Sequence, residues 1–382
     1  MQTPNPIEQT YRERRVAGRK ITRLFFASPQ LCGFRFPPEI LEPVYSSYLN
    51  RQDYDPHPKG LSAARSVLAN YYQGAGAEVD PENILITSGS SESFFYLFSL
   101  LCQAGDNILT PRPAYPLFDH IADLARVSLR HYPLAEDKNW AIDLDALRDR
   151  TDERTRAIVL VTPNNPTGAV TSPDQIRAVI DFANAKGLGL ICDEVFSEFF
   201  FGPGPFPRPM ALSRPRLCFT LNGISKMFAL PGLKLSWIAV TGEKTLVDSA
   251  VDRLETMVDT LLSCHLPIQE ALPRLFSEGV PFLRSYREEV RRRAQRAVEI
   301  LSGSRDLQFV PPSGGFYLMA KIVKEVGLSE EEFVIQLLRE KDLFVHPGYF
   351  YDEPHGMHFI MSFLHPPEVL QQGLQDLLSF IA

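Results

Sequence analysis

A lysine in the second half of the chain has the surroundings of a reactive amine. Lys226 follows an apolar run and lies in NGISKMFALPGLK (residues 222–234), among small and apolar residues. A lysine in a crevice of this kind can lose its proton and become a nucleophile for a carbonyl group. Taken alone, the motif is also explained by a solvated surface lysine, so the interpretation depends on which groups the fold brings to Lys226.

Two further polar residues each follow an apolar, strand-like run. Asp193 ends LICD (residues 190–193), and a buried carboxylate at the end of a strand needs a positive partner. A structural ion pair is the alternative for it. Asn165 lies in VTPNNPTG (residues 161–168), which places an asparagine at the carboxyl end of the sheet, where open α/β folds bind ligands. An ordinary Asn-Pro turn is the alternative there.

A fourth motif combines a glycine with hydroxyl residues. In ITSGSSE (residues 86–92) a strand-like run ends, Gly89 turns the chain, and serines open a helical pattern. Free N–H groups at the start of a helix can hold a phosphate, which makes Ser88, Gly89 and Ser90 candidates for that task. A serine N-cap beside a loop glycine is the alternative.

Short apolar runs alternate with amphipathic segments through the middle of the chain. We expect strands at residues 84–87, 107–110, 157–162, 189–192, 218–221 and 236–241, and helices at 92–101, 116–124, 173–185 and 243–262. Fully apolar strands that alternate with helices indicate an α/β fold, with a mostly parallel sheet covered by helices on both faces. The polar motifs would then meet in one crevice at the carboxyl ends of the strands.

The pattern changes after about residue 273. A long charged helix is expected at 282–301, followed by strand-like and helical segments at 316–321, 329–341, 343–346, 358–363 and from 366 onward. This order indicates a smaller α+β domain. We therefore divide the chain into an N-terminal arm (1–45) that packs with the small domain, a large domain (46–273) and the small domain (274–382). About 45 residues are too few for a core of their own.

The composition is that of an ordinary globular protein of about two domains. The 382 residues include 39 Lys and Arg against 46 Asp and Glu, a net charge of −7, which argues against nucleic acid as a partner. No apolar stretch approaches the roughly 18 residues of a membrane span, and the polar N-terminus lacks the apolar core of a secretory signal. The five scattered cysteines form no CxxC pair and indicate a cytoplasmic protein with reduced thiols. We expect neither a membrane partner nor a metal site.

The order and spacing of the four motifs resemble those of the fold type I pyridoxal-phosphate enzymes, and within them the class I and II aminotransferases. The resemblance extends from about Gly33 to the C-terminus. It implies that pyridoxal 5'-phosphate is the cofactor and that Lys226 forms the Schiff base with it. Asp193 would pair with the pyridine nitrogen and keep it protonated, which makes the ring an electron sink. Asn165 would donate to the 3′-oxygen of the ring, and Tyr115 would stack on the ring.

The same resemblance implies a phosphate site and a dimer. The residues that would contact the cofactor phosphate are Ser88, Gly89, Ser90, Ser225 and Lys234. Tyr54, in the Tyr-Asp-Pro stretch at 54–56, matches a tyrosine that reaches the phosphate of the neighbouring subunit. A homodimer with shared active sites is therefore implied.

The chain departs from the family pattern at the ring, at the phosphate and at the substrate. Phe196 stands where a tyrosine usually donates to the 3′-oxygen, and Lys234 and Gly223 stand where an arginine and a serine usually serve the phosphate. The largest departure lies in HFIMSF (residues 358–363). There Ile360 replaces the arginine that clamps the substrate α-carboxylate, and no arginine follows Arg339.

Ile360 argues against ordinary recognition of α-amino acids. Either the substrate lacks an α-carboxylate at that place, or another cation replaces the clamp, for which Arg35 and Arg112 are the candidates. Arg35 lies with Gly33 in the N-terminal segment, which runs along the active site in this family. A surface arginine between two core phenylalanines is its alternative. The predicted substrate-binding residues are Gly33, Arg35 and Ile360.

The resemblance implies a transaminase that moves an amino group between small-molecule amine and keto substrates. A β-eliminating carbon–sulfur lyase of the same fold shares the first chemical step and would release ammonia instead. A sensor that keeps the cofactor without turnover is the third possibility. Fused regulators of that kind carry a basic DNA-binding domain ahead of the fold, and the segment before Gly33 is too short to hold one.

Overall fold

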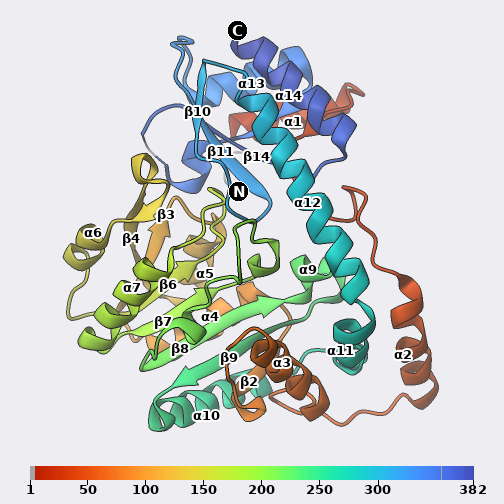
Figure 1. Ribbon diagram of the computed structural model, residues 1–382, viewed down its shortest axis with the longest axis vertical. Helices are drawn as coiled ribbons and strands as arrows, with labels where there is room; N and C mark the ends of the chain where they lie inside the picture. The colour runs from red at the N-terminus through yellow and green to blue at the C-terminus, as the bar shows by residue number, and fades with distance from the viewer. Residues whose placement is uncertain (1–4, 354) are drawn as a thin grey trace.

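An eight-stranded sheet is the frame of the larger part of the molecule in this computed structural model, which describes residues 5–353 and 355–382 (Figure 1). Its strands lie in the order β2-β9-β8-β7-β6-β3-β4-β5. Their bounds are β2 (Ile84–Thr87), β3 (Asn107–Arg112), β4 (Ser128–Ala135), β5 (Ala141–Ile142), β6 (Thr155–Val161), β7 (Gly189–Asp193), β8 (Leu217–Gly223) and β9 (Ser236–Gly242). Neighbours from β8 to β4 are parallel, whereas β9 is antiparallel to both its neighbours and β5 to β4. The expected α/β fold with a mostly parallel sheet is confirmed.

Helices cover both faces of this sheet because its central strands are apolar on both sides. In β6, for example, Val159 packs with the helices of one face and its neighbour Ile158 with those of the other. One face carries α4 (Ser90–Leu101), α5 (Leu117–Ala125) and α10 (Lys244–Leu261). The other carries α3 (Ser62–Gly74), α7 (Pro173–Lys186) and α11 (Leu266–Glu278). Shorter helices are α6 (Leu144–Asp149), α8 (Pro209–Leu212) and α9 (Ile224–Met227).

A four-stranded antiparallel sheet, in the order β10-β11-β14-β13, forms the smaller part of the molecule (Figure 1). Its strands are β10 (Leu307–Phe309), β11 (Tyr317–Ile322), β13 (His346–Pro347) and β14 (His358–Ser362). Leu318 and Phe359 on one face pack in a core with α12 (Val280–Leu301), α13 (Glu330–Lys341) and α14 (Pro367–Ile381). Met319 and Ile360 on the other face pack in a core of the large sheet. The predicted smaller α+β unit is confirmed.

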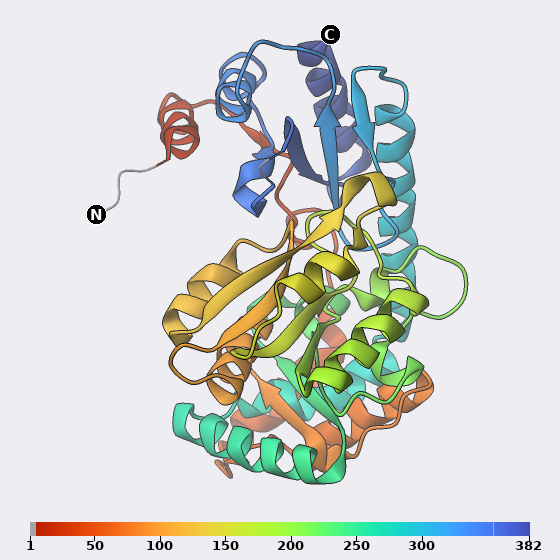
Figure 2. The ribbon, with the colours of Figure 1, turned by 90° about the vertical axis from the view of Figure 1, so that its left-hand side faces the viewer.

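The N-terminal segment reaches both parts of the molecule. Its first helix, α1 (Pro6–Val16), packs against α13 (Figure 2), and β1 (Thr22–Arg23) pairs in parallel with β12 (Leu343–Phe344). The next helix, α2 (Pro38–Arg51), packs instead against α11. The expected limits at 45/46 and 273/274 therefore fall inside α2 and α11, and we propose that the division of the chain follows the ends of these helices.

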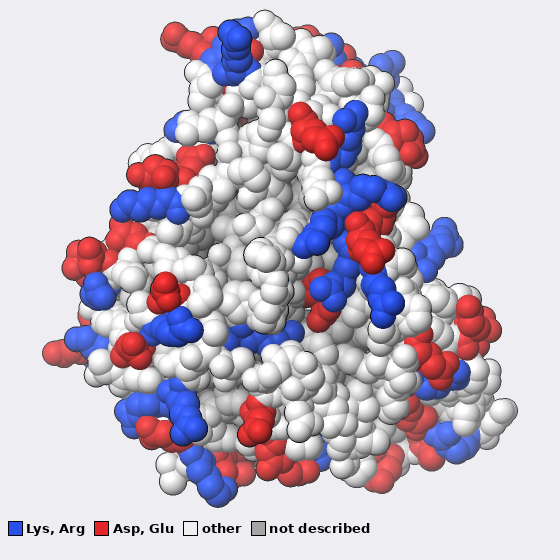
Figure 3. Space-filling view, in the orientation of Figure 1, with Lys and Arg blue, Asp and Glu red and all other residues white. Residues whose placement is uncertain are grey.

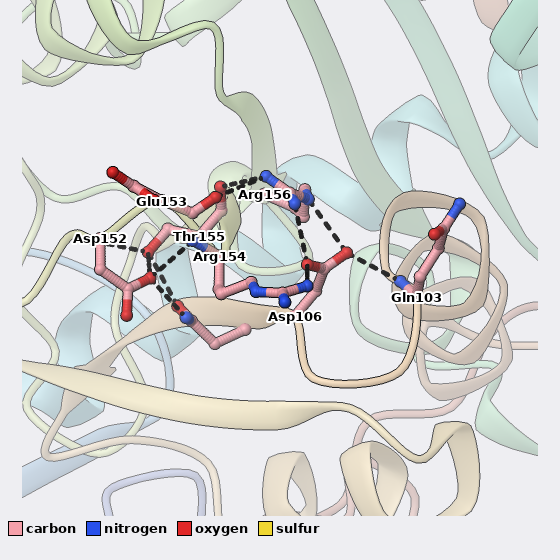
Figure 4. Close-up of polar contacts among 8 residues, drawn as sticks. Gln103, Asp106, Asp152, Glu153, Arg154, Thr155 and Arg156 are labelled. Atoms are coloured by element: carbon pink, nitrogen blue, oxygen red, sulfur yellow. Dashed lines mark hydrogen bonds and ion pairs between the residues drawn. The ribbon is translucent and has the colours of Figure 1, made fainter.

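The amino ends of the parallel strands are closed by polar contacts (Figure 4). Asp106 is 3% exposed and accepts hydrogen bonds from Arg156 Nη2 at 2.8 Å and from the backbone N–H of Gln103 at 3.0 Å. Asn107 donates to Asp152 at 2.9 Å, which joins the start of β3 to the loop before β6. Hydrogen bonds and ion pairs within the chain fix this edge, whereas the opposite, carboxyl edge carries the polar motifs.

A buried ion pair stabilises the end of β7. Glu194 is fully buried and pairs with Arg208, which is 4% exposed. Arg208 also donates to the hydroxyl of Tyr71 on α3 at 2.5 Å and lies over the rings of Tyr71 and Tyr72. Tyr72 accepts in turn from Trp237 on β9 at 2.8 Å. The carboxylate next to Asp193 is thus neutralised by a guanidinium that joins the end of β7 to α3.

None of the helices in the described residues has the length and apolar character that crossing a membrane requires.

The ion pair gives the first prediction. Arg208→Met leaves Glu194 buried without a cation and should lower the free energy of unfolding by about 3–5 kcal/mol. The matched control is Arg216→Met, because Arg216 pairs with Glu243 in the half-exposed part of the surface, where such pairs contribute about 1 kcal/mol or less. Urea unfolding of both variants measures the difference. Equal losses in the two variants would contradict the proposed role of the buried pair.

Candidate active site

A cavity of about 400 Å³ lies at the carboxyl edge of the large sheet, next to the small sheet. Of the predicted site residues, Tyr115, Asn165 and Lys226 line it. Tyr115 follows β3 and Asn165 follows β6, whereas Lys226 lies in α9 directly after β8. Because these strands run in parallel, their carboxyl ends meet at one edge, and residues far apart in the sequence come together.

The carboxylate of Asp193 is buried behind this cavity. Asp193 ends β7, between β6 and β8, and is 8% exposed. One of its oxygens accepts a hydrogen bond from the N–H of Val195 at 3.0 Å. Burial raises the pKa of Asp193 to about 6, although the Val195 N–H and the positive charge of Lys226 act in the opposite direction. The carboxylate is therefore held in a place that favours a cationic neighbour.

Lys226 is the cation that faces it. Burial lowers the pKa of the Lys226 ammonium, the charge of Lys234 lowers it further, and Asp193 opposes both. The Nζ atom lies 5.9 Å from the centroid of the Phe196 ring. A lysine with a lowered pKa beside a cavity can present a neutral amine to a carbonyl carbon.

Two neighbouring asparagines after β6 have different tasks. Asn164 uses its side-chain oxygen to hold the loop, accepting from the N–H of Thr167 at 3.2 Å and from its hydroxyl at 2.8 Å. Asn165 is 8% exposed, and within the described residues its Oδ1 atom is buried without a hydrogen-bond partner. A buried amide with unused polar capacity that lines a cavity is suited to a ligand.

The predicted phosphate residues gather near the start of α4. Gly89 is the N-cap of α4, and a Cβ atom on it would meet no atom within 4 Å, so the space before the helix is open. The N–H of Ser88 donates to Glu92 Oε2 at 2.6 Å, while the first N–H groups of a helix such as α4 have no partner inside it. Lys234 is exposed and close enough for its charge to affect Lys226.

The other predicted cofactor residues do not line the cavity. Ser225 precedes Lys226 in α9 and is partly buried. Tyr54 is 72% exposed on the loop between α2 and α3. Gly223 has no room for a serine, because a Cβ atom there would collide with the Ser236 hydroxyl.

The predicted substrate residues do not line the cavity. Gly33 and Arg35 are exposed, and Arg35 lies between the buried Phe34 and Phe36, which agrees with its structural alternative. Ile360 is fully buried, one strand away from the cavity wall. Their assignment to substrate binding remains a prediction that the cavity does not support.

Most of the aromatic wall of the cavity could not be recognised from the sequence. Phe25 and Phe26 come from the N-terminal segment, and Tyr317, His346 and Tyr351 from the smaller part of the molecule. Phe25 stacks on His346 with ring centroids 3.7 Å apart. The only local signals were the Phe-Phe doublet and the aromatic stretch HPGYFY at 346–351, and neither indicates what it faces.

Comparison with known proteins decides the family. The sequence model of "Aminotransferase class I and II" matches residues 52–376, most of the chain. The chain belongs to the class I and II aminotransferases. It is 29% identical over 373 residues to the glutamate-pyruvate aminotransferase AlaA of Haemophilus influenzae, covering 96% of this chain and 91% of that one. An aminotransferase structure from Escherichia coli superposes with a TM-score of 0.90 at 26% identity, covering 99% and 94% of the two chains. The fold also matches alanine aminotransferase from Pyrococcus furiosus, with a TM-score of 0.92 at 23% identity over 98% and 95% of the two chains.

The protein is therefore a transaminase that depends on pyridoxal 5'-phosphate. Its site fits that cofactor on observations that are independent of the comparisons. A buried carboxylate, Asp193, suits a protonated ring nitrogen, and the side-chain amide of Asn165, which lines the cavity and can donate through its Nδ2 group, suits a ring oxygen. The open space before α4 suits a phosphate, and Lys226 is the amine that faces the cavity.

The burial of Asp193 predicts a stability change with pH. Its pKa is raised in the folded protein, from 3.8 to about 6, so the folded state binds the proton more tightly than the unfolded state. Ionising Asp193 therefore costs stability as the pH rises through this range. In the cofactor-free protein, Asp193→Asn should raise the free energy of unfolding above pH 6, by up to about 3 kcal/mol, and change it little near pH 4.

Urea unfolding at pH 4.0 and pH 7.5 tests this dependence. Asp181→Asn is the control. Asp181 is exposed on α7, so its substitution should leave the free energy of unfolding unchanged at both pH values. An Asp193→Asn variant that is less stable than the wild type at pH 7.5 would refute the burial argument.

Proposed function

We propose that transamination takes place at the cavity beside Lys226, with Lys226 as the residue that binds the cofactor covalently and then moves protons. The observation that carries this proposal is the juxtaposition of Lys226 with the buried Asp193 at the ends of adjacent strands. When bound, the cofactor supplies an aldehyde that takes up the amino group and a ring that accepts an electron pair. Asp193 would keep the ring nitrogen protonated, Asn165 would contact the ring oxygen, and Tyr115 would cover the ring.

The residues divide the remaining work by their charge. Lys226 Nζ, with its lowered pKa, would take the proton from the amine-bearing carbon of the substrate. Phe196 offers only a ring face beside this amine, so one fewer donor is available to the ring oxygen. The start of α4, with Ser88, Gly89 and Ser90, would hold the phosphate together with Ser225 and Lys234. Lys234 would act there as a point charge without the two-pronged grip of an arginine.

We propose a homodimer with shared sites as the working form. Tyr54 is a large aromatic residue that is 72% exposed, which supports a role outside its own subunit. A cytoplasmic location is supported by the cysteines, all of which are free in the structure. Cys192 and Cys218 have Sγ atoms 3.8 Å apart on neighbouring buried strands and are not joined.

A single half-reaction tests the proposal. The holoenzyme is mixed with a panel of amines and amino acids, and the cofactor is then extracted and separated by chromatography. The wild type should convert the bound cofactor to its amine form with one equivalent of carbonyl product. Lys226→Ala should reduce the rate by several orders of magnitude, because the proton-transferring amine is lost. Lys186→Ala, on the exposed end of α7, is the control and should keep the wild-type rate.

The products also separate the other two activities. Ammonia release without the amine form of the cofactor would identify a β-eliminating lyase. Neither product from any compound would identify a sensor without turnover. Wild-type conversion in Lys226→Ala would overturn the proposed role of this residue.

A further inference from the structure

The cavity beside Lys226 offers a substrate aromatic surface but almost no charge. Rings from Phe25, Tyr115, Tyr317, His346 and Tyr351 line it. Within the described residues, Lys226 is the only lysine or arginine among its lining side chains. The pKa values of Tyr115, Tyr317 and Tyr351 are all raised by burial, so these residues remain neutral phenols.

His346 does not supply the missing positive charge. It lies between the ring of Phe25 and the hydroxyl of Tyr351, which is 3.1 Å from its Nδ1 atom. Burial lowers the pKa of His346 to about 3, so the imidazole is neutral at physiological pH. An anionic group on the substrate would therefore meet neutral aromatic side chains on this wall.

The strand behind His346 is apolar as well. Ile360 on β14 pairs in register with His346 on β13 and with Met319 on β11. Ile360 is fully buried, and it packs in an apolar core with Met319 and Tyr351. The side chain at this position thus brings no hydrogen-bond donor to the cavity.

Neither Arg112 nor Arg23 lines the cavity. Arg112 lies 3.6 Å from Asp352 and lines a different cavity with His131 and Arg150. Arg23 stacks on the ring of Phe26 at 4.1 Å without lining the cavity. Three of the arginines of α12 (Figure 3), Arg284, Arg287 and Arg291, line a third cavity, of about 540 Å³, which shares no residue with the one beside Lys226.

We infer that the amine substrate of this enzyme carries an aromatic or aliphatic body and no carboxylate on its amine-bearing carbon. This inference rests on the proposed function of the cavity. A carboxylate moved from water into this aromatic cavity would lose hydration without gaining a guanidinium, which is unfavourable. A neutral body gains from the same wall through burial of apolar surface.

The reaction balances for such an amine. The amine-bearing carbon gives up its amino group, one proton and an electron pair, and becomes the carbonyl carbon of an aldehyde or ketone. A water molecule supplies the carbonyl oxygen, the Lys226 amine is released from the cofactor, and the amino group, the proton and the electron pair pass to the cofactor. Lys226 Nζ is the group placed to carry that proton.

A matched pair of substrates tests the inference. The half-reaction of the holoenzyme is followed with 2-phenylethylamine and with L-phenylalanine, which differ only by the α-carboxylate. The amine should react with a second-order rate constant about 10-fold or more above that of the amino acid. Ile360→Arg should shift this ratio toward the amino acid by about 10–100-fold, and Ile360→Met, which adds no charge, should leave it unchanged.

A binding measurement gives a readout that does not depend on turnover and does not depend on the folding of the arginine variant. Isothermal titration of the wild-type holoenzyme compares 3-phenylpropan-1-ol with 3-phenylpropanoate. The alcohol should bind more tightly than the acid. Tighter binding of the acid, together with faster reaction of L-phenylalanine, would overturn the inference and leave the proposed function intact. Loss of that preference in Arg23→Met would then identify Arg23 as the clamp.

The two proposals fail in different ways. If no compound transfers its amino group while the alcohol still binds more tightly than the acid, the proposed function fails and the neutral character of the cavity stands. The inference is wrong if 2-phenylethylamine and L-phenylalanine transfer their amino groups at similar rates and the alcohol and the acid bind equally well. A carboxylate would then carry no energetic penalty in this site.

Discussion

The site depends on the removal from water of two opposite charges at the ends of adjacent strands. Asp193 ends β7 and Lys226 follows β8, and burial opposes the charge on each of them. Each group therefore stabilises the ionised form of the other, and either charge alone would be unfavourable in this buried place. A cofactor ring with a protonated nitrogen, joined to the lysine, would satisfy both groups. The parallel sheet is the scaffold that makes the arrangement possible, because it delivers both residues to one edge.

Two other charges lie near this pair: Lys234 lowers the pKa of Lys226 in the same direction as burial, and Glu194 carries its own counter-ion. Glu194 adjoins Asp193 in the sequence, and Arg208 neutralises it within the same buried region. On the cavity side, Phe196 and the neutral His346 add ring surface without charge. The scarcity of charged side chains that keeps the Lys226 amine reactive also leaves the cavity without a cation that could pair with a substrate carboxylate. Cofactor chemistry and substrate selection thus follow from one electrostatic pattern.

The fold was largely predictable because its central strands are apolar on both faces, which is a local signal. Strand β4 (Ser128–Ala135) was not predicted, because it lies near the sheet edge and its first half contains exposed polar residues. The site was predictable where a residue follows a strand directly, as Lys226 and Asp193 do. His346 could not be predicted, since its role depends on Phe25, more than 300 residues away in the sequence. Packing between distant segments leaves no pattern in either of them.

The location of the covalent bond between cofactor and protein shows whether Lys226 is the reactive amine of the site. The holoenzyme is reduced with borohydride, digested and analysed by mass spectrometry, with Lys226→Ala treated in parallel. The reduced cofactor should be attached to the peptide containing Lys226 in the wild type and to no peptide in the variant. Attachment to Lys234 or to any other lysine in the wild-type protein would contradict this assignment.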